Sequence, residues 1–437
     1  MIRDARYEQM SRGDLDKLQL ERLKAMAAYV YDKSPFYQRA MKEKGVAPGD
    51  IQTLADITKL PFTSKLDFRD NYPFGLMAVS MDKVVRVHSS SGTTGKPVVA
   101  PYTQGDIDTW SDVMARTLAT AGVTENDVLQ NSYGYGLFTG GLGFHYGAER
   151  LGASVIPTGG GNTKRQILLL QDLGTSVITC TPSYSLILNE TALDMGVDLR
   201  ETKLRVGVFG AEPWSDQMRK DIESKMGISA INIYGLTEII GPGVSTECPY
   251  QCGMHIAEDH FLAEIINPDT GKQLPYGEIG ELVLTTLTKE AQPVLRFRTK
   301  DITSLNPEPC KCGRTHVRMS RITGRTDDML VVKGVNVFPS QIESVLLDVE
   351  GVEPHYLIVV DRQQGFKSDY LEIWVEVSED IFSDEMSKME DLEDRLRSEM
   401  DSVLAISAKI KLVEPKTITR TEGKAKRVVD KSELPIL

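Results

Sequence analysis

A segment rich in glycine and hydroxyl side chains is the first part of this chain that could do chemistry. It reads Ser89-Ser-Ser-Gly-Thr-Thr-Gly-Lys-Pro97 and follows a strand predicted over residues 84–87. The glycines let the backbone curl close to a ligand, where N–H groups, hydroxyls and the Lys96 ammonium can surround phosphate oxygens. Only two residues separate the glycines, so the spacing is not that of a Walker A loop. The segment indicates a phosphate site of another kind, and a flexible polar turn is the alternative.

Two further segments place polar residues at the ends of predicted strands. Tyr234-Gly-Leu-Thr-Glu238 offers the hydroxyl of Thr237 to a phosphate and an oxygen of Glu238 to Mg²⁺. Phe209-Gly-Ala-Glu-Pro-Trp214 ends another predicted strand. Ligands of doubly wound sheets bind beyond the carboxyl ends of the strands, so both segments are candidates. Each is weak alone, since a strand followed by glycine and a polar residue is common.

Three segments in the second half of the chain combine charge with turn residues. Arg296-Phe-Arg-Thr-Lys-Asp301 sets one carboxylate among cations, which suits a ribose diol; a surface ion-pair cluster is the alternative. The others are Gly324-Arg-Thr-Asp-Asp-Met-Leu-Val-Val-Lys-Gly-Val-Asn336 and Glu422-Gly-Lys-Ala-Lys-Arg427. Taken alone, the last reads as a solvated basic turn.

The elements that must position these residues alternate between strand and helix from about residue 80 to 235. Strands are predicted over residues 84–87, 128–130, 154–156, 176–179, 205–209 and 230–233, and helices over 106–121, 164–173 and 215–225. Alternating strands and helices predict a mostly parallel sheet covered by helices.

The pattern differs on either side of this region. A helix is predicted over residues 13–44, and strands over 261–266 and 281–287. From residue 325 onward, strands at 329–332, 356–360 and 370–377 and helices near 339–348 and 384–404 predict a small α+β domain. We therefore expect an α/β protein with a large N-terminal domain, residues 1–324, and a small C-terminal domain, residues 325–437.

Composition narrows the classes of function. The 437 residues carry 50 Lys and Arg against 62 Asp and Glu, a net charge of −12. This balance argues against a nucleic-acid binder. No apolar run approaches the ~18 residues of a membrane span, and the N-terminus lacks the apolar stretch of a signal peptide. We expect no nucleic-acid or membrane partner, and a cytoplasmic protein with reduced thiols.

Four of the five cysteines fall in two clusters, Cys248-Pro-Tyr-Gln-Cys252-Gly-Met-His255 and Cys310-Lys-Cys312-Gly-Arg-Thr-His316. Sets of four thiolate and imidazole ligands are typical of structural zinc sites. The ligands predicted here are Cys248, His255, Cys310 and Cys312, with Cys252 as the competing fourth ligand. Free thiols are the alternative.

Taken in order, these segments resemble the motif series of the AMP-forming acyl- and aryl-CoA ligases, the adenylate-forming superfamily. Four stretches are most similar to the subfamily that acts on phenylacetate. They are Tyr133-Gly-Tyr-Gly-Leu-Phe-Thr-Gly-Gly-Leu-Gly143, His255-Ile-Ala-Glu-Asp-His-Phe261, Leu284-Thr-Thr-Leu-Thr-Lys-Glu290 and Gly334-Val-Asn-Val-Phe-Pro-Ser-Gln-Ile-Glu343. The resemblance implies a fold in which the small C-terminal domain is mobile, rotating about a hinge near Asp327.

The resemblance also implies roles for individual residues. The ATP phosphates would be enclosed by Ser90, Ser91, Gly92, Thr93, Thr94, Gly95 and Lys96. The rest of the nucleotide would be contacted by Glu212, Tyr234, Gly235 and Thr237, and its ribose by Asp301 assisted by Arg325. Glu238 would hold Mg²⁺, and Lys424 would act on the α-phosphate and the substrate carboxylate, with Lys426 as a nearby rival. Thr94, Glu238 and Lys424 are the expected catalytic residues, and Lys333, Gly334 and Asn336 would serve the coenzyme A step.

The aromatic and glycine-rich stretch 133–144 would line the acid pocket. Tyr135 and Phe138 are the expected contacts to a ring, and Gly210 and Ala211 would form the opposite wall. A glycine-rich loop packed in the core is the alternative.

The implied reaction joins an aryl acid, above all phenylacetate, to coenzyme A through acyl-AMP. ATP, Mg²⁺ and coenzyme A are the expected cofactors, with zinc as a structural ion, and the family suggests a homodimer. The acid could instead be benzoate, hydroxybenzoate or an indole acid, because one methylene changes binding by only ~1–3 kcal/mol. Two other readings are a carrier protein as acyl acceptor and a nucleotide-binding module that adenylates nothing.

Overall fold

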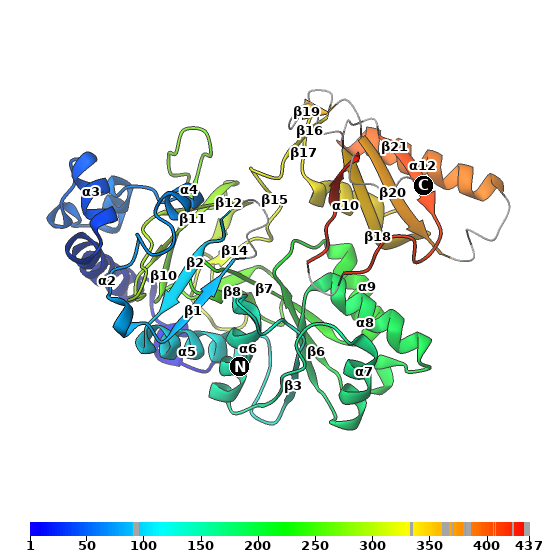
Figure 1. The fold of residues 1–437 in the computed structure, drawn as a ribbon, viewed down its shortest axis with the longest axis horizontal. Helices are drawn as coiled ribbons and strands as arrows, with labels where there is room; N and C mark the ends of the chain where they lie inside the picture. Colours follow the sequence, from blue (N-terminus) through cyan, green and yellow to red (C-terminus); the bar gives the residue numbers. More distant parts are fainter. Residues whose placement is uncertain are drawn as a thin grey trace. The chain divides into compact units, whose positions relative to one another are not determined.

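The computed structural model describes residues 1–90, 96–332, 335–360, 367–368, 371–378, 381, 386–404, 406, 408–421 and 424–431 (Figure 1). The chain forms two compact units. The first comprises Met1–Cys180, Arg200–Ala211 and Ile228–Arg321, and the second Thr181–Leu199, Glu212–Gly227 and Ile322–Leu437. Among the described residues, no helix is long and apolar enough to cross a membrane.

A nine-stranded sheet is the centre of the first unit. Its order is β13-β14-β9-β8-β7-β6-β5-β3-β4. Strands β4, β3, β5, β6 and β7 run parallel, and the remaining neighbours pair antiparallel. The strands are β3 (Val128–Asn131), β4 (Ser154–Ile156), β5 (Val177–Cys180), β6 (Val206–Gly210), β7 (Ser229–Leu236), β8 (Gly241–Glu247), β9 (Met254–Ile256), β13 (Leu305–Asn306) and β14 (Arg318–Met319). The five strands predicted between residues 128 and 233 form the parallel part of this sheet, as predicted, whereas the strand predicted over residues 84–87 lies outside it and pairs antiparallel in a separate hairpin.

Helices α5 (Gln104–Thr120), α6 (Thr139–Leu151) and α7 (Thr163–Asp172) belong to the same unit. Helix α6 was not predicted, because its glycines are poor helix formers. The glycines allow close packing: a Cβ on Gly141 would lie 2.3 Å from the Gly134 carbonyl oxygen, and one on Gly147 2.5 Å from the Met114 Cβ of α5. Tight packing outweighs propensity here.

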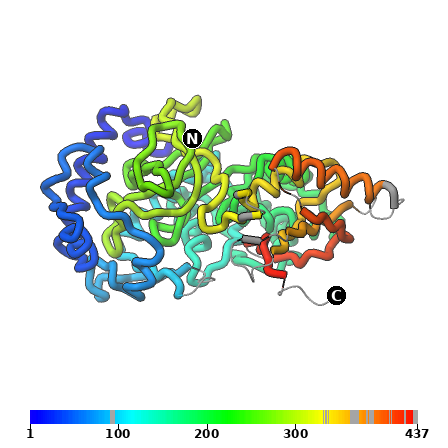
Figure 2. The backbone as a smooth tube through the Cα atoms, turned by 90° about the horizontal axis from the view of Figure 1, so that it is seen from above, coloured from blue at the N-terminus to red at the C-terminus, as the bar shows by residue number. Residues whose placement is uncertain are grey.

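The first unit also contains a hairpin of β1 (Arg86–Ser89) and β2 (Val99–Tyr102) and an antiparallel set of β10 (Phe261–Ile266), β11 (Gly280–Thr286) and β12 (Phe297–Thr303). The N-terminal helices are α1 (Ala5–Glu8), α2 (Arg12–Lys33), α3 (Pro35–Glu43) and α4 (Lys65–Asp70), traced in blue in Figure 2. The single helix predicted over 13–44 is therefore two helices. The chain breaks at Ser34 because Pro35 disfavours helical backbone in the residue before it.

The second unit combines helices α8 (Pro182–Asp194), α9 (Asp216–Met226), α10 (Pro339–Leu347) and α12 (Met386–Leu404) with two sheets. One sheet has the order β17-β16-β19 and the other β21-β20-β18-β22. Their strands are β16 (Leu330–Val332), β17 (Val335–Val337), β18 (Val352–Val360), β19 (Lys367–Ser368), β20 (Leu371–Val377), β21 (Lys409–Val413) and β22 (Val428–Asp430), and the short β15 (Gly324–Arg325) precedes them. Ile342, Ile358, Ile373 and Leu396 are among the fully buried residues of this core. The α+β pattern predicted for the C-terminal part is confirmed.

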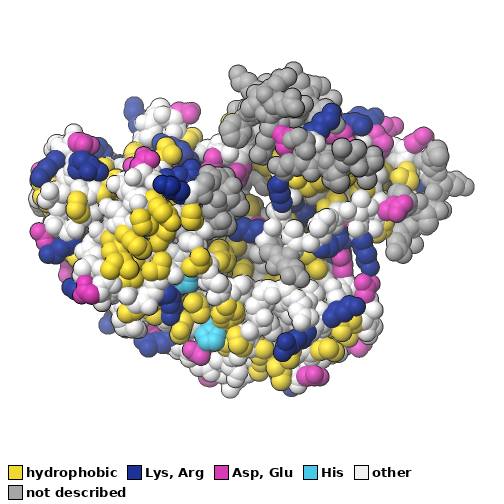
Figure 3. All heavy atoms as spheres, in the orientation of Figure 1, with side chains coloured by type: hydrophobic (Ala, Val, Ile, Leu, Met, Phe, Trp, Pro, Cys, Tyr) yellow, Lys and Arg dark blue, Asp and Glu magenta, His cyan; other side chains and the backbone are white. Residues whose placement is uncertain are grey.

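Charged side chains are scattered over the face of the molecule drawn in Figure 3, between uncharged and hydrophobic areas. Basic and acidic groups are interspersed on the described surface of this face and do not form one large basic patch.

Candidate active site

Tyr133 joins three strand ends at one edge of the large sheet. It follows β3, and its hydroxyl donates to the carbonyl of Cys180 at the end of β5 (2.5 Å). The same oxygen accepts from the backbone N–H of Gly210 at the end of β6 (3.0 Å). The ring is 6% exposed and stacks on Phe144, with 5.2 Å between centroids. Tyr133 therefore aligns the carboxyl ends of β3, β5 and β6, where a parallel sheet binds ligands.

Tyr135 and Phe138, the predicted ring contacts, both lie half-buried in the segment that connects β3 to α6. The Tyr135 hydroxyl accepts from the Nδ2 of Asn131 (2.8 Å), and burial raises the pKa of this tyrosine to about 12. Tyr135 is therefore neutral at physiological pH. Phe138 covers Gly140, where a Cβ would lie 2.6 Å from the ring. This glycine is needed for the close approach.

The other predicted wall residues are Gly210, which ends β6, and Ala211, which follows it. Gly210 approaches β7 so closely that a Cβ would lie 2.4 Å from the carbonyl oxygen of Ile233. Ala211 is exposed and adopts φ = 72°, a left-handed conformation uncommon for a residue other than glycine. Asn131 has a role that the sequence reasoning missed, because its Nδ2 also donates to the carbonyl of Gly141 (2.7 Å). A polar residue at the end of a buried strand was the available signal.

The segment predicted to bind phosphate starts and ends at a closed stem. Ser90 donates its N–H to the Val98 carbonyl, and its Oγ accepts from the Val98 N–H, both at 2.9 Å. The N–H of Ser89 donates to the Leu137 carbonyl (2.9 Å), which places the stem beside the Tyr135 segment. Lys96 is exposed, with its Nζ 5.3 Å from the centroid of the Tyr72 ring. The predicted residues Ser91, Gly92, Thr93, Thr94 and Gly95 lie outside the described residues.

Tyr234 and Asp301, two predicted nucleotide contacts, are brought together from different sheets. The Tyr234 hydroxyl donates to Oδ2 of Asp301 at 2.6 Å. Asp301 lies in β12 and is 4% exposed. Lys300 next to it adopts φ = 68°, a strained conformation that fixes the chain direction before the carboxylate. Gly235 approaches β8 closely, because a Cβ there would lie 2.0 Å from the Gly241 carbonyl oxygen.

Glu238, the predicted Mg²⁺ ligand, lies on a backbone segment that is held by three side-chain donors. Lys289 Nζ donates to the Ile239 carbonyl (2.8 Å), the Tyr102 hydroxyl to Ile240 (3.0 Å) and Trp110 Nε1 to Pro242 (2.9 Å). Each donor is at most 3% exposed. Glu238 is itself 3% exposed, with Oε1 3.9 Å from Lys65 Nζ, and Thr237 before it is buried as well. A buried carboxylate on a fixed backbone suits an oxygen-binding cation.

The sequence singles out Lys289 only as a member of the stretch 284–290. The structure shows that it supports the backbone beside Glu238. Its ammonium is 4.6 Å from the centroid of the Tyr102 ring. Burial lowers the pKa of Lys289 to about 8, although Asp106 and Glu238 oppose the shift. This amine therefore holds the Glu238 segment at a cost in desolvation.

In the second unit, Glu212 contacts the segment that carries Lys424. The Oε1 of Glu212 accepts from the Ser183 N–H (2.8 Å), and its Oε2 accepts from the N–H of Ala425 (2.9 Å). Lys424 is exposed. The predicted nucleotide contact at Glu212 thus also fixes the residue after the predicted catalytic lysine.

The remaining predicted residues of the second unit lie between residues 325 and 336. Arg325, predicted to assist at the ribose, donates through Nε and Nη2 to the carboxylate of Asp327 (2.9 and 3.0 Å). Lys333 and Gly334 lie outside the described residues, and so does the side chain of Asn336 in β17.

The predicted zinc ligands lie together in the first unit. One ligand atom from each of Cys248, His255, Cys310 and Cys312 lies within 4.8 Å of the others. The sulfurs of Cys248 and Cys310 are 3.7 Å apart, and Cys312 Sγ is 3.4 Å from His255 Nε2. A zinc tetrahedron with Zn–S of ~2.3 Å has sulfur–sulfur edges of roughly 3.8 Å. Cys252, the competing ligand, is exposed, with its sulfur 3.5 Å from that of Cys310. The donor set fits zinc.

Two protein-family models match this chain. The model of the AMP-binding enzyme family matches residues 18–287, and that of the AMP-binding enzyme C-terminal domain matches residues 334–432. A phenylacetate-coenzyme A ligase of Thermus thermophilus is 49% identical over 98% of this chain and 99% of its own.

Two solved structures of 2-hydroxyisobutyryl-CoA ligase are also similar, each 29% identical. One, in the postadenylation state with 2-HIB-AMP, has a TM-score of 0.93 and covers 98% of this chain and 92% of its own. The other, in the thioesterification state with 2-HIB-AMP and CoA, has a TM-score of 0.72 and covers 97% and 91%.

The pKa of Lys289 predicts how stability depends on pH. Between about 8 and the usual lysine value of 10.5, the unfolded chain binds a proton that the folded chain has released, so stability should rise with pH. The Lys289→Met variant lacks this rise. The difference in free energy of unfolding between the wild type and the variant should therefore grow with pH, by up to about 3 kcal/mol over the full interval.

Urea unfolding at pH 7.5, 8.5 and 9.5 would measure this difference. Trp110→Phe is the matched control, since it removes the donor to Pro242 without removing a titratable group, and its loss of stability should be the same at each pH. Parallel curves for the wild type and Lys289→Met would contradict the prediction.

Proposed function

Because the chain belongs to the AMP-binding enzyme family, we propose that it activates phenylacetate to its coenzyme A thioester, with ATP cleaved to AMP and pyrophosphate. The observation that carries the proposal is the 49% identity to a phenylacetate-coenzyme A ligase over nearly the full length of both chains. The positions of Tyr234, Asp301 and Glu238 support it, because they combine an anchored diol acceptor with a buried cation ligand.

The proposed reaction has two steps. An oxygen of the acid's carboxylate attacks the α-phosphorus of ATP, the bond to the β-phosphate oxygen breaks, and acyl-AMP and pyrophosphate form. The thiol sulfur of coenzyme A then attacks the acyl carbon, its proton is lost, and the bond to AMP breaks. Negative charge builds up on the phosphate oxygens in the first step, so fixed cations and donors there lower the barrier.

The chain's own residues have distinct parts in this scheme. Tyr234 orients the Asp301 carboxylate toward the two ribose hydroxyls. The donors Lys289, Tyr102 and Trp110 keep Glu238 in place; when bound, Mg²⁺ would be held by this carboxylate and would neutralise charge on the departing pyrophosphate. Lys424 is the proposed donor to the α-phosphate.

The acid would bind beside Tyr135 and Phe138, opposite Gly210 and Ala211. The neutral Tyr135 phenol and the adjacent glycines suit a flat, uncharged ring. Benzoate, hydroxybenzoate and indole acids would be activated by the same chemistry. They would need a pocket of a different size.

We also propose that residues 325–437 form a mobile domain, as the motif resemblance implies. Lys424 would then serve the first step, and Lys333, Gly334 and Asn336 the second. The matched C-terminal family model supports a separate domain in this part of the chain.

The cluster of Cys248, His255, Cys310 and Cys312 is proposed as a structural zinc site. It joins the ends of β8 and β9 to the loop between β13 and β14, a loop of eleven residues (307–317) with no regular structure. Four strong ligands would stabilise that loop far better than its own hydrogen bonds.

The acid preference is tested by AMP and pyrophosphate release with ATP, Mg²⁺ and coenzyme A across a panel of aryl acids. We expect the highest kcat/KM with phenylacetate, because the relative that is 49% identical over nearly the full length of both chains is a phenylacetate-coenzyme A ligase, and release should depend on coenzyme A. Higher turnover with another acid would keep the mechanism and change the substrate. No AMP from any acid, in protein that binds ATP, would contradict the proposal.

Replacing Lys424 should separate the two steps. Lys424→Ala should slow adenylation by ~10²–10³, the cost of losing one transition-state donor, and spare thioester formation from supplied acyl-AMP. Lys426→Ala is the control and should leave adenylation within a fewfold of the wild type. Equal losses in both steps would remove the role assigned to Lys424, and a larger loss in Lys426→Ala would transfer it to Lys426.

Metal analysis tests the cysteine cluster. Purified protein should contain about one zinc per chain, and Cys310→Ser should lose the zinc and unfold at a lower temperature. Cys180→Ser, at a buried cysteine elsewhere, should keep the zinc. Cys252→Ser should keep it too, and loss of zinc in this variant would make Cys252 the fourth ligand.

A further inference from the structure

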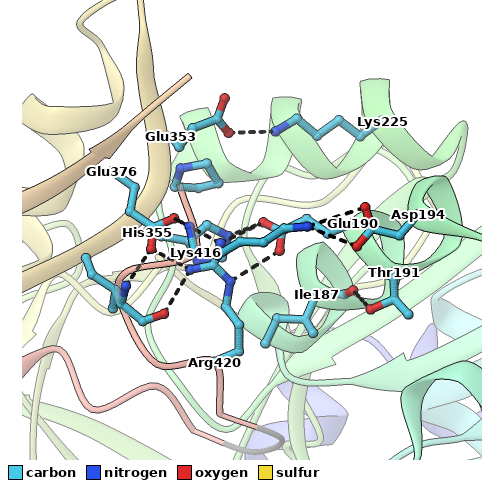
Figure 4. Close-up of polar contacts among 12 residues, drawn as sticks. Ile187, Glu190, Thr191, Asp194, Lys225, Glu353, His355, Glu376, Lys416 and Arg420 are labelled. Carbon is cyan, nitrogen blue, oxygen red and sulfur yellow. Dashed lines mark hydrogen bonds and ion pairs between the residues drawn. The ribbon is translucent and has the colours of Figure 1, made fainter. Parts of the chain in front are cut away.

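Arg420 lies between two carboxylates of the second unit, four residues before Lys424 (Figure 4). Toward β20, its Nη1 and Nη2 donate to the two oxygens of Glu376 at 2.8 and 2.9 Å. Toward α8, its Nε and Nη2 donate to the two oxygens of Glu190 at 3.2 and 3.3 Å. One guanidinium thus joins the C-terminal sheet to helix α8 through two bidentate pairs, a geometry that the planar fork of arginine allows.

The contact between Arg420 and Glu376 lies within the C-terminal sheet and the segment that follows it. Glu376 is 1% exposed, and its oxygens also accept from the backbone N–H groups of Lys416 (3.1 Å) and Ile418 (2.7 Å). Separating Arg420 from this carboxylate would leave a buried, unpaired charge, which is strongly unfavourable. This pair therefore holds the start of the 416–425 segment against β20 permanently.

The Glu190 side is more exposed and has partners from two elements. Besides Arg420, Oε1 of Glu190 contacts Nε2 of His355, in β18, at 2.5 Å. Burial by itself would raise the pKa of Glu190, but His355 and Arg420 outweigh it and lower this pKa to about 2. Glu190 is therefore a carboxylate at physiological pH. About a third of its side chain is exposed, so water can replace these contacts.

The same segment is held again at its other end. The N–H of Ala425 donates to Glu212, as described above. Lys424 lies between the two anchors, Arg420 on Glu190 and Ala425 on Glu212. We propose that Glu190 is a positioning residue for the first step: acting through Arg420, it keeps the segment in the place from which Lys424 serves adenylation. This inference rests on the proposed function.

The contacts of Glu190 are also the ones that can break between adenylation and thioester formation. The two solved structures of 2-hydroxyisobutyryl-CoA ligase have TM-scores of 0.93 and 0.72 against this one chain over nearly the same share of it, so that relative changes conformation between its postadenylation and thioesterification states. In this chain, the partly exposed contacts of Glu190 can be exchanged for water, whereas the buried Arg420–Glu376 pair persists. Glu190 should therefore favour the first step without assisting the second.

The test is Glu190→Gln, which keeps the size and removes the charge. Adenylation, measured as pyrophosphate release from acid and ATP without coenzyme A, should fall about tenfold, within the range that misplacing a catalytic group produces. Thioester formation from supplied acyl-AMP should be unchanged or faster. Glu190→Asp, which keeps the charge, should retain most of the adenylation rate.

Asp194→Asn is the matched control. Asp194 lies one turn along α8 and pairs with Lys416 at 3.0 Å, but both side chains are at least 60% exposed, so this pair should contribute little. Its adenylation rate should stay within twofold of the wild type. Equal losses in both steps for Glu190→Gln, or the same loss in Asp194→Asn, would overturn the proposal.

A second measurement does not depend on catalysis. Hydrogen exchange should be faster in Glu190→Gln than in the wild type over a peptide spanning residues 416–425, and unchanged in Asp194→Asn. Faster exchange in a protein that makes no AMP from any acid would refute the proposed function and keep the positioning contact. Unchanged exchange with unchanged adenylation would refute the positioning role and leave the proposed function intact.

Discussion

The hydroxyl of Tyr133 is the contact on which the site in the first unit depends. It bonds to the last residues of β5 and β6, and Tyr133 itself follows the end of β3, so three parallel strands end at one level. The chain leaves each strand there, and the segments with Tyr135, Ala211 and Glu238 follow β3, β6 and β7 at that edge. The stem of the segment predicted to bind phosphate joins the same edge through the Leu137 carbonyl. Stacking on Phe144 restricts the ring to one orientation, so the alignment is stiff.

Two kinds of polar contact serve two different needs in this molecule. The donors to Ile239, Ile240 and Pro242 are buried, and removing either of the first two leaves a buried carbonyl without this donor, at a cost of ~1–3 kcal/mol. Such contacts keep the backbone beside Glu238 in one position, as transition-state stabilisation requires. The contacts of Glu190 are partly open to water. They can hold a segment in place and still release it.

The success of the sequence predictions depended on the kind of element. The five parallel strands were placed to within a few residues at either end, because buried strands of a parallel sheet are mostly apolar, and β10 was predicted with its observed ends. Helix α6 was missed because glycines argue against a helix until their close contacts with Gly134 and Met114 are known. The first strand lies two residues later than predicted, because its register is set by pairing with β2.

The sequence by itself determined the chemistry that this chain can perform: which residue types occur, in what order, and at which ends of which strands. That was enough to predict Asp301, Glu238, Lys424 and the cysteine cluster as site residues, since motif order and local spacing are properties of the chain alone. Only the tertiary structure decided what holds each group. Tyr234 donates to Asp301, Lys289 donates to the backbone next to Glu238, and Arg420 donates to Glu190. These partners are 50 to 230 residues apart, and their contacts follow from sheet register and side-chain packing, which no local pattern encodes.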